Sequence, residues 1–180
     1  MTDQKIIEAV LAGNIEAFRE LTKRYESRVA ATVIGMLGKC AEAEDVGQET
    51  FIRFYNSLGN FRGESSVGTY LTRIAINLSL NELKRRKRRS MFFQSEPEEG
   101  FEVRNTYSSS EYSGEREIVQ RAIQKLEPKF RSVIVLRLLD GYSTQETSEI
   151  LNVPVGTVLS RLSRAQKKLK KILIPYVMET

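Results

Sequence analysis

Hydroxyl and cationic side chains gather near the carboxyl end of the chain, in residues 155–173, where their spacing predicts one helix. Side chains of these types hydrogen-bond base edges and phosphates of DNA. Four of them can reach base edges or phosphates: Thr157, Ser160, Arg161 and Arg164. Four lysines are expected to meet phosphates alone: Lys167, Lys168, Lys170 and Lys171. Apolar residues at helical spacing predict the buried face: Val155, Val158, Leu159, Leu162, Leu169 and Ile172. The chemistry is that of a helix entering a major groove.

The residues before this helix predict the turn and the shorter helix that position it. Ser143 and Glu146 have the spacing of a capping box, which starts a helix. Asn152 tolerates the left-handed conformation that ends a helix, and Pro154 lacks an N–H that the first turn of the next helix does not need. These signals predict a helix-turn-helix. The alternative is an ordinary helical hairpin with a solvated basic face.

Charge favours an anionic partner, and composition argues against several kinds of site. The 180-residue chain has a net charge of +5 and a pI near 9.3, distributed as +4 in residues 1–89, −4 in residues 90–113 and +5 in residues 114–180. It has no histidine, which disfavours zinc and general-base chemistry, and a single Cys40, which excludes an internal disulfide framework. No apolar run reaches membrane-spanning length. We therefore expect a cytoplasmic protein that is not an enzyme and needs no cofactor or metal.

Helical periodicity covers nearly the whole chain, so we expect an all-α fold of two small domains. Within residues 1–90, helices are expected over residues 3–11, 15–34, 42–58 and from about 66 through the basic run at 84–89. Residues 91–113 lose this periodicity and are acidic and hydroxyl-rich, which predicts a flexible linker. Residues 114–180 then form the second domain and end in the helix-turn-helix.

The helix that starts near Glu42 carries an acidic face. Asp45, Gln48 and Glu49 share that face by their spacing of three and four residues. One interpretation is a docking surface for a basic or polar partner helix, and another is a solvated acidic face. A third is a carboxylate metal site, as in a metal-dependent nuclease, which would use Glu42, Glu44, Asp45 and Glu49.

A loop at residues 60–66 and a basic run at residues 84–89 are candidate nucleic-acid contacts. The loop presents an aromatic ring, a guanidinium and hydroxyls, which can stack on unstacked bases and bond their edges. The alternative is that Phe61 lies in the core beneath a plain turn. The six consecutive cations suit a phosphate backbone, or else form a solvated helix end.

Two stretches in this order resemble bacterial RNA polymerase sigma factors of the extracytoplasmic-function (ECF) type. AEDVGQETFIRFYNSLGNFRGESSVGTYLTRIAINLSLNELKRRKRR is similar to region 2 of that family, and LEPKFRSVIVLRLLDGYSTQETSEILNVPVGTVLSRLSRAQKKL is similar to region 4. The resemblance covers essentially the whole chain. It implies a dissociable subunit that directs core RNA polymerase to promoters and stabilises a melted minus-10 element.

The resemblance also implies a role for each candidate residue. The region 2 residues that dock on the coiled coil of the polymerase clamp are Asp45, Gln48 and Glu49. The residues that capture a flipped minus-10 base from single-stranded DNA are Asn60, Phe61, Arg62, Ser65 and Ser66. The helix face that meets the melted element is Thr69, Tyr70, Arg73 and Asn77. The residues that bind the minus-35 duplex are Thr157, Ser160, Arg161, Arg164 and Lys167.

Further partners follow from the resemblance alone. The segment at residues 130–139 would hold the flap tip of the second-largest polymerase subunit, and an anti-sigma factor would hold the protein inactive, in some cases at the inner membrane face. No small-molecule substrate is implied.

Three residues depart from the family pattern. Tyr70 replaces a usual tryptophan, Gly47 a common valine, and Leu159 a usual lysine. These departures bear on promoter sequence and affinity. The alternative function is a helix-turn-helix regulator that binds duplex DNA as a dimer without joining polymerase.

Overall fold

The computed structural model describes residues 1–93 and 114–177, and every regular element in these ranges is helical. The elements are α1 (Asp3–Leu11), α2 (Ile15–Leu37), α3 (Ala41–Ser57), the 3₁₀ turn η1 (Leu58–Asn60), α4 (Val67–Phe93), α5 (Gly114–Gln124), α6 (Pro128–Ile134), the π-helical segment η2 (Val135–Leu139), α7 (Thr144–Leu151) and α8 (Val155–Val177). The prediction of an all-α fold with two domains is confirmed. The expected linker lies outside the described residues except for residues 91–93, which extend α4.

Helices α1 to α4 form the amino-terminal domain around a core of fully buried apolar side chains. Local signals set the helix starts: the side chains of Thr2 and Asn14 accept hydrogen bonds from the backbone of the first turns of α1 and α2. The core side chains with the least exposure are Ile6, Leu21, Val29, Val33, Met36, Phe54, Leu71, Ala75 and Ile76. Burying them fixes α4, which carries part of the candidate DNA site, against α2 and α3.

Helices α5 to α8 form the carboxyl-terminal domain, and its helix-turn-helix matches the expected signals. The capping box of Ser143 and Glu146 is complete, and Asn152 has the left-handed φ of 51°. Pro154 lies just before α8, where its carbonyl accepts from the amides of the first turn. Val158 is fully buried, as predicted. Leu159 and Val155 are not: they are 53% and 37% exposed, so their assignment to the buried face was wrong.

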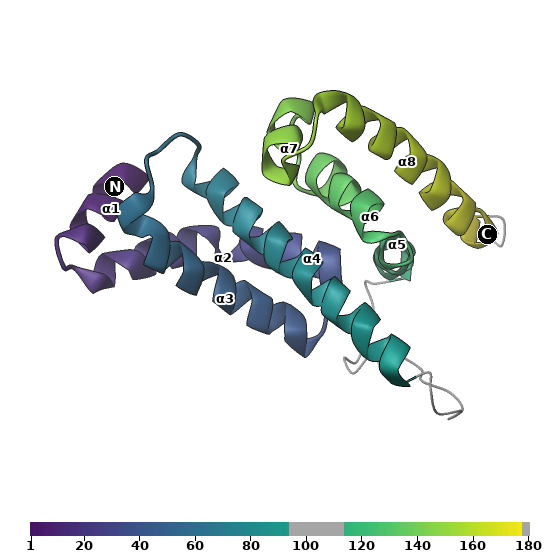
Figure 1. Cartoon of the computed structure of the whole chain (residues 1–180), viewed down its shortest axis with the longest axis horizontal. Coiled ribbons are helices and arrows are strands. Elements are labelled where there is room, and N and C mark those ends of the chain that lie inside the picture. Colours follow the sequence, from purple (N-terminus) through teal and green to yellow (C-terminus); the bar gives the residue numbers. More distant parts are fainter. Residues whose placement is uncertain (94–113, 178–180) are drawn as a thin grey trace.

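The two domains lie side by side, with α5, α6, η2 and α7 of the second against α2 and α4 of the first, and with α8 on the outer side (Figure 1). A helix leaves its last four carbonyls without partners in its own ladder. Those of α2 accept from side chains elsewhere: Gln120 Nε2 donates to Ile34 O at 2.8 Å, Gln124 Nε2 to Gly35 O at 2.8 Å, Arg131 Nη1 to Met36 O at 2.6 Å and Arg86 Nη1 to Leu37 O at 3.2 Å. The second domain therefore supplies most of the carboxyl-terminal cap of α2.

Arg131 is the most deeply buried of these donors, with 7% of its surface exposed. Its guanidinium also donates to Gln124 and to the carbonyl of Leu126. Burial, and to a smaller extent the nearby Arg86, lower the pKa of Arg131 to about 10, so the side chain stays charged at neutral pH. The cation is stabilised there by backbone carbonyls, including one at the negative end of the α2 dipole.

Four further contacts join the domains near η2. The hydroxyls of Tyr142 and Thr72 are 2.8 Å apart, and Arg28 lies over the Tyr142 ring at 5.8 Å. Thr32 Oγ1 donates to the Asp140 carboxylate at 2.8 Å. At Gly35, a Cβ atom would lie 3.0 and 3.1 Å from the two γ carbons of Val135, so α2 and η2 approach each other as closely as a glycine permits.

Candidate nucleic-acid interface

The loop after η1 lines a pocket of about 310 Å³ that both domains share. Its lining residues are Asn60, Phe61, Arg62, Gly63, Glu64, Ser65, Tyr70, Arg73 and Glu149. Eight of these come from the predicted loop or from α4, so the loop and this helix face line one pocket together. Glu149 comes from α7 and was not predicted, because its proximity depends on the packing of the domains.

Aromatic packing positions the loop. Phe61 meets Tyr70 edge to face, with ring centroids 5.2 Å apart, and meets Phe54 in the same way at 6.0 Å. Phe54 is fully buried, whereas Phe61 and Tyr70 are half-buried. Phe61 therefore packs against the core, as the alternative interpretation expected, and its ring also lines the pocket, while its contact with a base stays a prediction.

Arg73 lines this pocket, and its side chain has an unsatisfied hydrogen-bond donor among the described residues. Its Nε atom is buried and has no hydrogen-bond partner among the described residues. Arg62, beside it on the loop, is exposed. A buried guanidinium N–H without an acceptor is unfavourable, so Arg73, which also lines the pocket, keeps an unsatisfied donor among the described residues.

Three of the predicted minus-10 residues lie outside the pocket lining. Ser66 caps α4, where its Oγ accepts from Thr69 N at 3.1 Å and lies 2.9 Å from Thr69 Oγ1. Thr69 is only 7% exposed, so these two side chains help to start the helix. Asn77 is exposed on α4. A capping serine has the same sequence signature as a ligand-binding one, which is why sequence could not separate the roles.

The predicted DNA-binding side chains of α8 differ in exposure. Ser160, Arg164 and Lys167 are exposed, whereas Thr157 and Arg161 are half-buried. Lys168 makes an ion pair with Glu127 at 2.8 Å and lies over the Phe130 ring, so it is engaged within its own domain. The hydrogen bonds from Lys168 and Lys129 lower the pKa of Glu127.

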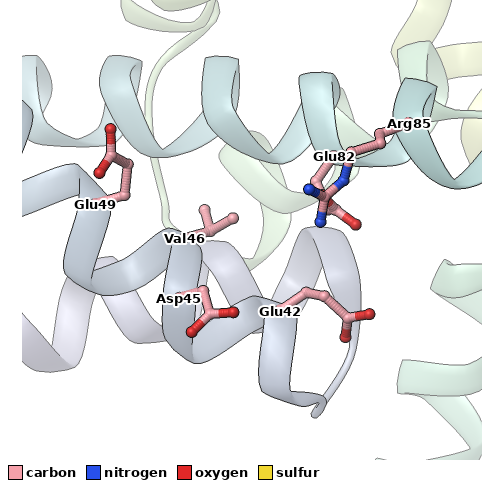
Figure 2. A pocket seen from close by; sticks show the side chains of 6 residues that line it. All are labelled: Glu42, Asp45, Val46, Glu49, Glu82 and Arg85. Atoms are coloured by element: carbon pink, nitrogen blue, oxygen red, sulfur yellow. The ribbon is translucent and has the colours of Figure 1, made fainter.

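The predicted docking face borders an acidic groove of about 220 Å³ between α3 and α4 (Figure 2). Its lining residues are Glu42, Asp45, Val46, Glu49, Glu82 and Arg85. Asp45 and Glu49 thus lie together as predicted, and Gln48 is exposed outside the lining. In the part of the chain that the structure describes, no group of three or more acidic, histidine or cysteine side chains could hold a metal ion.

Glu82 binds three of the six cations in the basic run at residues 84–89. Its carboxylate, 8% exposed, makes ion pairs with Arg85 at 2.8 Å, Arg86 at 3.4 Å and Arg89 at 3.3 Å. The spacing of three, four and seven residues could have indicated these pairs from sequence. Lys87 and Arg88 are exposed and make no ion pair within residues 1–93 and 114–177.

Comparison with known proteins supports what the fold and the site indicate. Residues 21–89 match the family Sigma-70 region 2, and residues 116–169 match Sigma-70, region 4. RNA polymerase sigma-H factor of Pseudomonas aeruginosa is 36% identical, over 98% of this chain and 96% of its own length. ECF RNA polymerase sigma factor SigW of Bacillus subtilis is 34% identical, over 96% of this chain and 97% of its own.

Solved structures show the same fold. CnrH, in complex with the cytosolic domain of CnrY, has a TM-score of 0.70 and 25% identity, and the match covers 96% of this chain and 97% of CnrH. The sigma factor RpoE of Bartonella quintana, in complex with the anti-sigma factor NepR, has a TM-score of 0.69 at 22% identity, over 88% of this chain and 98% of that one.

The fold and the site define an all-helical protein of the class that binds DNA through a region 4 helix-turn-helix. The chain belongs to the ECF sigma factors, the initiation subunits that direct core RNA polymerase to promoters. This assignment supports the sigma-factor interpretation and not the dimeric regulator. In the described residues no helix is long and apolar enough to cross a membrane.

Proposed function

We propose that this ECF sigma factor captures an unstacked minus-10 base in the loop pocket while α8 binds the minus-35 duplex and α3 docks on the polymerase clamp. The observation that carries the proposal is the pocket at residues 60–65, which Phe61, Tyr70 and Arg73, all half-buried, line together. Rings offer stacking surfaces to a base, and the guanidinium offers N–H donors to its edge or to a phosphate. Extruding a base costs a few kcal/mol, which these contacts would offset in part.

Charge supports the docking partner. The groove that contains Asp45 and Glu49 is lined by four carboxylates against one guanidinium, which favours a basic or polar helix such as the clamp coiled coil. Leu138 and Leu139 in η2 are each 50% exposed, and we propose them as the apolar contact for the flap tip. Because two structural relatives were solved with partner proteins, one of them named as an anti-sigma factor, we also expect such a regulator, with the protein held in the cytoplasm or at the inner membrane face.

Run-off transcription with core polymerase on a promoter library tests the proposal. Asp45→Ala should reduce binding to core polymerase and transcription together, whereas Glu44→Ala, an exposed acid outside the groove lining, should change neither. Arg73→Ala should keep polymerase binding but weaken capture of single-stranded minus-10 DNA by the holoenzyme. Sequence-specific binding of duplex DNA by the purified chain without polymerase would count against the proposal.

A further inference from the structure

Leu159 is an apolar side chain on the open side of the recognition helix. It is 53% exposed and Val155, one turn earlier, is 37% exposed, whereas Val158 and Ala165 on the same helix are fully buried. The carboxyl-terminal domain therefore fills its core without Leu159. An exposed leucine gains nothing from burial in the free protein, so a role in stability does not account for it.

The position of Leu159 places it within the DNA-binding face. It is the fifth residue of α8, in the part of a recognition helix that contacts base edges. Ser163, four residues on, and Ser160, the next residue, are both exposed, and Arg164 and Lys167 follow on the same open side. A Cβ atom added at Gly156, three residues before Leu159, would meet no atom of a neighbouring segment within 4 Å, so the helix surface at that position is open.

We propose that Leu159 determines part of the promoter specificity by contacting the 5-methyl group of a thymine in the minus-35 element. A leucine side chain can neither donate nor accept a hydrogen bond, and a thymine 5-methyl is the apolar group that the major groove presents. The exposed cations Arg164 and Lys167 hold the helix against phosphates, which brings Leu159 to the base edges. The inference rests on the proposed binding of α8 to the minus-35 duplex.

The test uses holoenzyme assembled from core polymerase and the full chain. A strong promoter is selected from the library, and each minus-35 thymine on either strand is replaced in turn by deoxyuridine, which lacks only the methyl group. The wild-type holoenzyme should lose about fourfold in affinity at one position, the factor that corresponds to about 0.8 kcal/mol for one buried methyl-sized group. Leu159→Ala should bind the thymine promoter several-fold more weakly and should lose its response to that one methyl group.

Two variants serve as controls. Leu159→Met, which keeps an apolar side chain of similar size, should retain the response to the methyl group. Ile174→Ala removes another exposed apolar side chain, 43% exposed, at the far end of α8 and should leave the methyl response unchanged. Thermal unfolding of Leu159→Ala should match the wild type, because the side chain contributes little to the core.

Several outcomes would overturn the proposal. One is that the affinity of the wild-type holoenzyme does not change when any minus-35 thymine is replaced by deoxyuridine. Another is that Leu159→Ala responds to that replacement as strongly as the wild type. A third is that Leu159→Ala loses affinity equally on the thymine and deoxyuridine promoters. The last result would instead indicate a contact with polymerase. If α8 does not bind the minus-35 element at all, base-pair substitutions throughout that element will leave affinity unchanged, which is a separate result.

Discussion

At the scale of single residues, cations with the same sequence signature divide into structural ones and ones without an ion pair in the described part of the chain. Arg86 donates to the Leu37 carbonyl and to Cys40 Sγ at 3.0 Å, and it makes ion pairs with Glu42 and Glu82. Lys87 and Arg88, the next two residues, are exposed. In the basic run at residues 84–89, Arg86 therefore holds the fold together, whereas Lys87 and Arg88 form an exposed cationic surface. Lys87 and Arg88 can contact phosphates without breaking an ion pair within residues 1–93 and 114–177.

Salt dependence separates the two groups of cations. Lys87→Ala with Arg88→Ala should lower the log–log slope of promoter binding against salt by about two, because each lost phosphate contact removes about 0.9. Arg86→Ala should lower the thermal stability of the protein, because it uncaps α2 and leaves the nearly buried Glu82 with fewer partners. Filter binding of holoenzyme over a salt series, with thermal unfolding of the free chain, measures both effects. An unchanged slope in the double variant would make Lys87 and Arg88 a solvated helix end.

At the scale of elements, a feature could be predicted from the sequence when the residues that cause it lie close together in the chain. The capping box at Ser143 and the left-handed Asn152 act within a few residues, so the helix-turn-helix was predicted correctly. The exposure of Leu159 was missed because its spacing also fits a buried stripe, and burial depends on which neighbouring helix is present. Glu149 at the loop pocket was missed because contact between α7 and that loop arises from tertiary packing alone.

The carboxyl end of α2 is the element that depends most on the other domain. Gln120→Ala with Gln124→Ala should weaken the packing of the domains by about 1–3 kcal/mol, at about 0.5–1.5 kcal/mol per hydrogen bond, since separated domains would let water satisfy the carbonyls. Small-angle scattering should report a larger radius of gyration for the double variant. Gln145→Ala is the matched control, because that side chain bonds Glu149 on its own helix at 3.0 Å. Identical scattering from the double variant and the wild type would show that these bonds do not hold the domains together.

At the scale of the whole molecule, we expect the packed arrangement to prevent the simultaneous binding of both promoter elements that we propose. Minus-35 and minus-10 positions are separated by about 25 base pairs, or about 85 Å of duplex at ~3.4 Å per pair. In the structure Tyr142 beside the helix-turn-helix touches Thr72 on α4, and Glu149 closes one side of the loop pocket. Promoter binding as proposed therefore requires the domains to separate.

Asp140 makes this separation dependent on pH. Burial raises the pKa of its carboxyl from 3.8 to about 6, against smaller opposing effects of the Thr32 hydroxyl and of Arg28. Once protonated, the carboxyl can donate to Thr32 Oγ1, which is then free to donate to the Arg28 carbonyl 3.1 Å away. Packing is therefore strongest below about pH 4, weakens as the pH rises to about 6, and stays weaker above that value.

Asp140→Asn should remove this pH dependence and keep the domains packed at neutral pH, because the neutral amide resembles the protonated carboxyl. Small-angle scattering between about pH 4.5 and about pH 7 checks the expectation. Glu26→Gln, which removes an exposed acid from α2, should leave the wild-type response intact. If Asp140→Asn expands with rising pH as the wild type does, another group controls the packing.

Replacing Gly35 by alanine is expected to stabilise the helix α2 but to weaken the packing of the two domains. Gly35→Ala should stabilise α2 by roughly 0.5–1 kcal/mol through helix propensity. The added methyl group would also press on the γ carbons of Val135, a stiff side chain in a buried position, and so force the domains apart. The variant should resist heat at least as well as the wild type within its amino-terminal domain, yet expose its minus-10 pocket without help from polymerase. We therefore expect one added methyl group to act on helix stability and on the closed state in opposite directions, and to shift the free protein toward the open form that the proposed function requires.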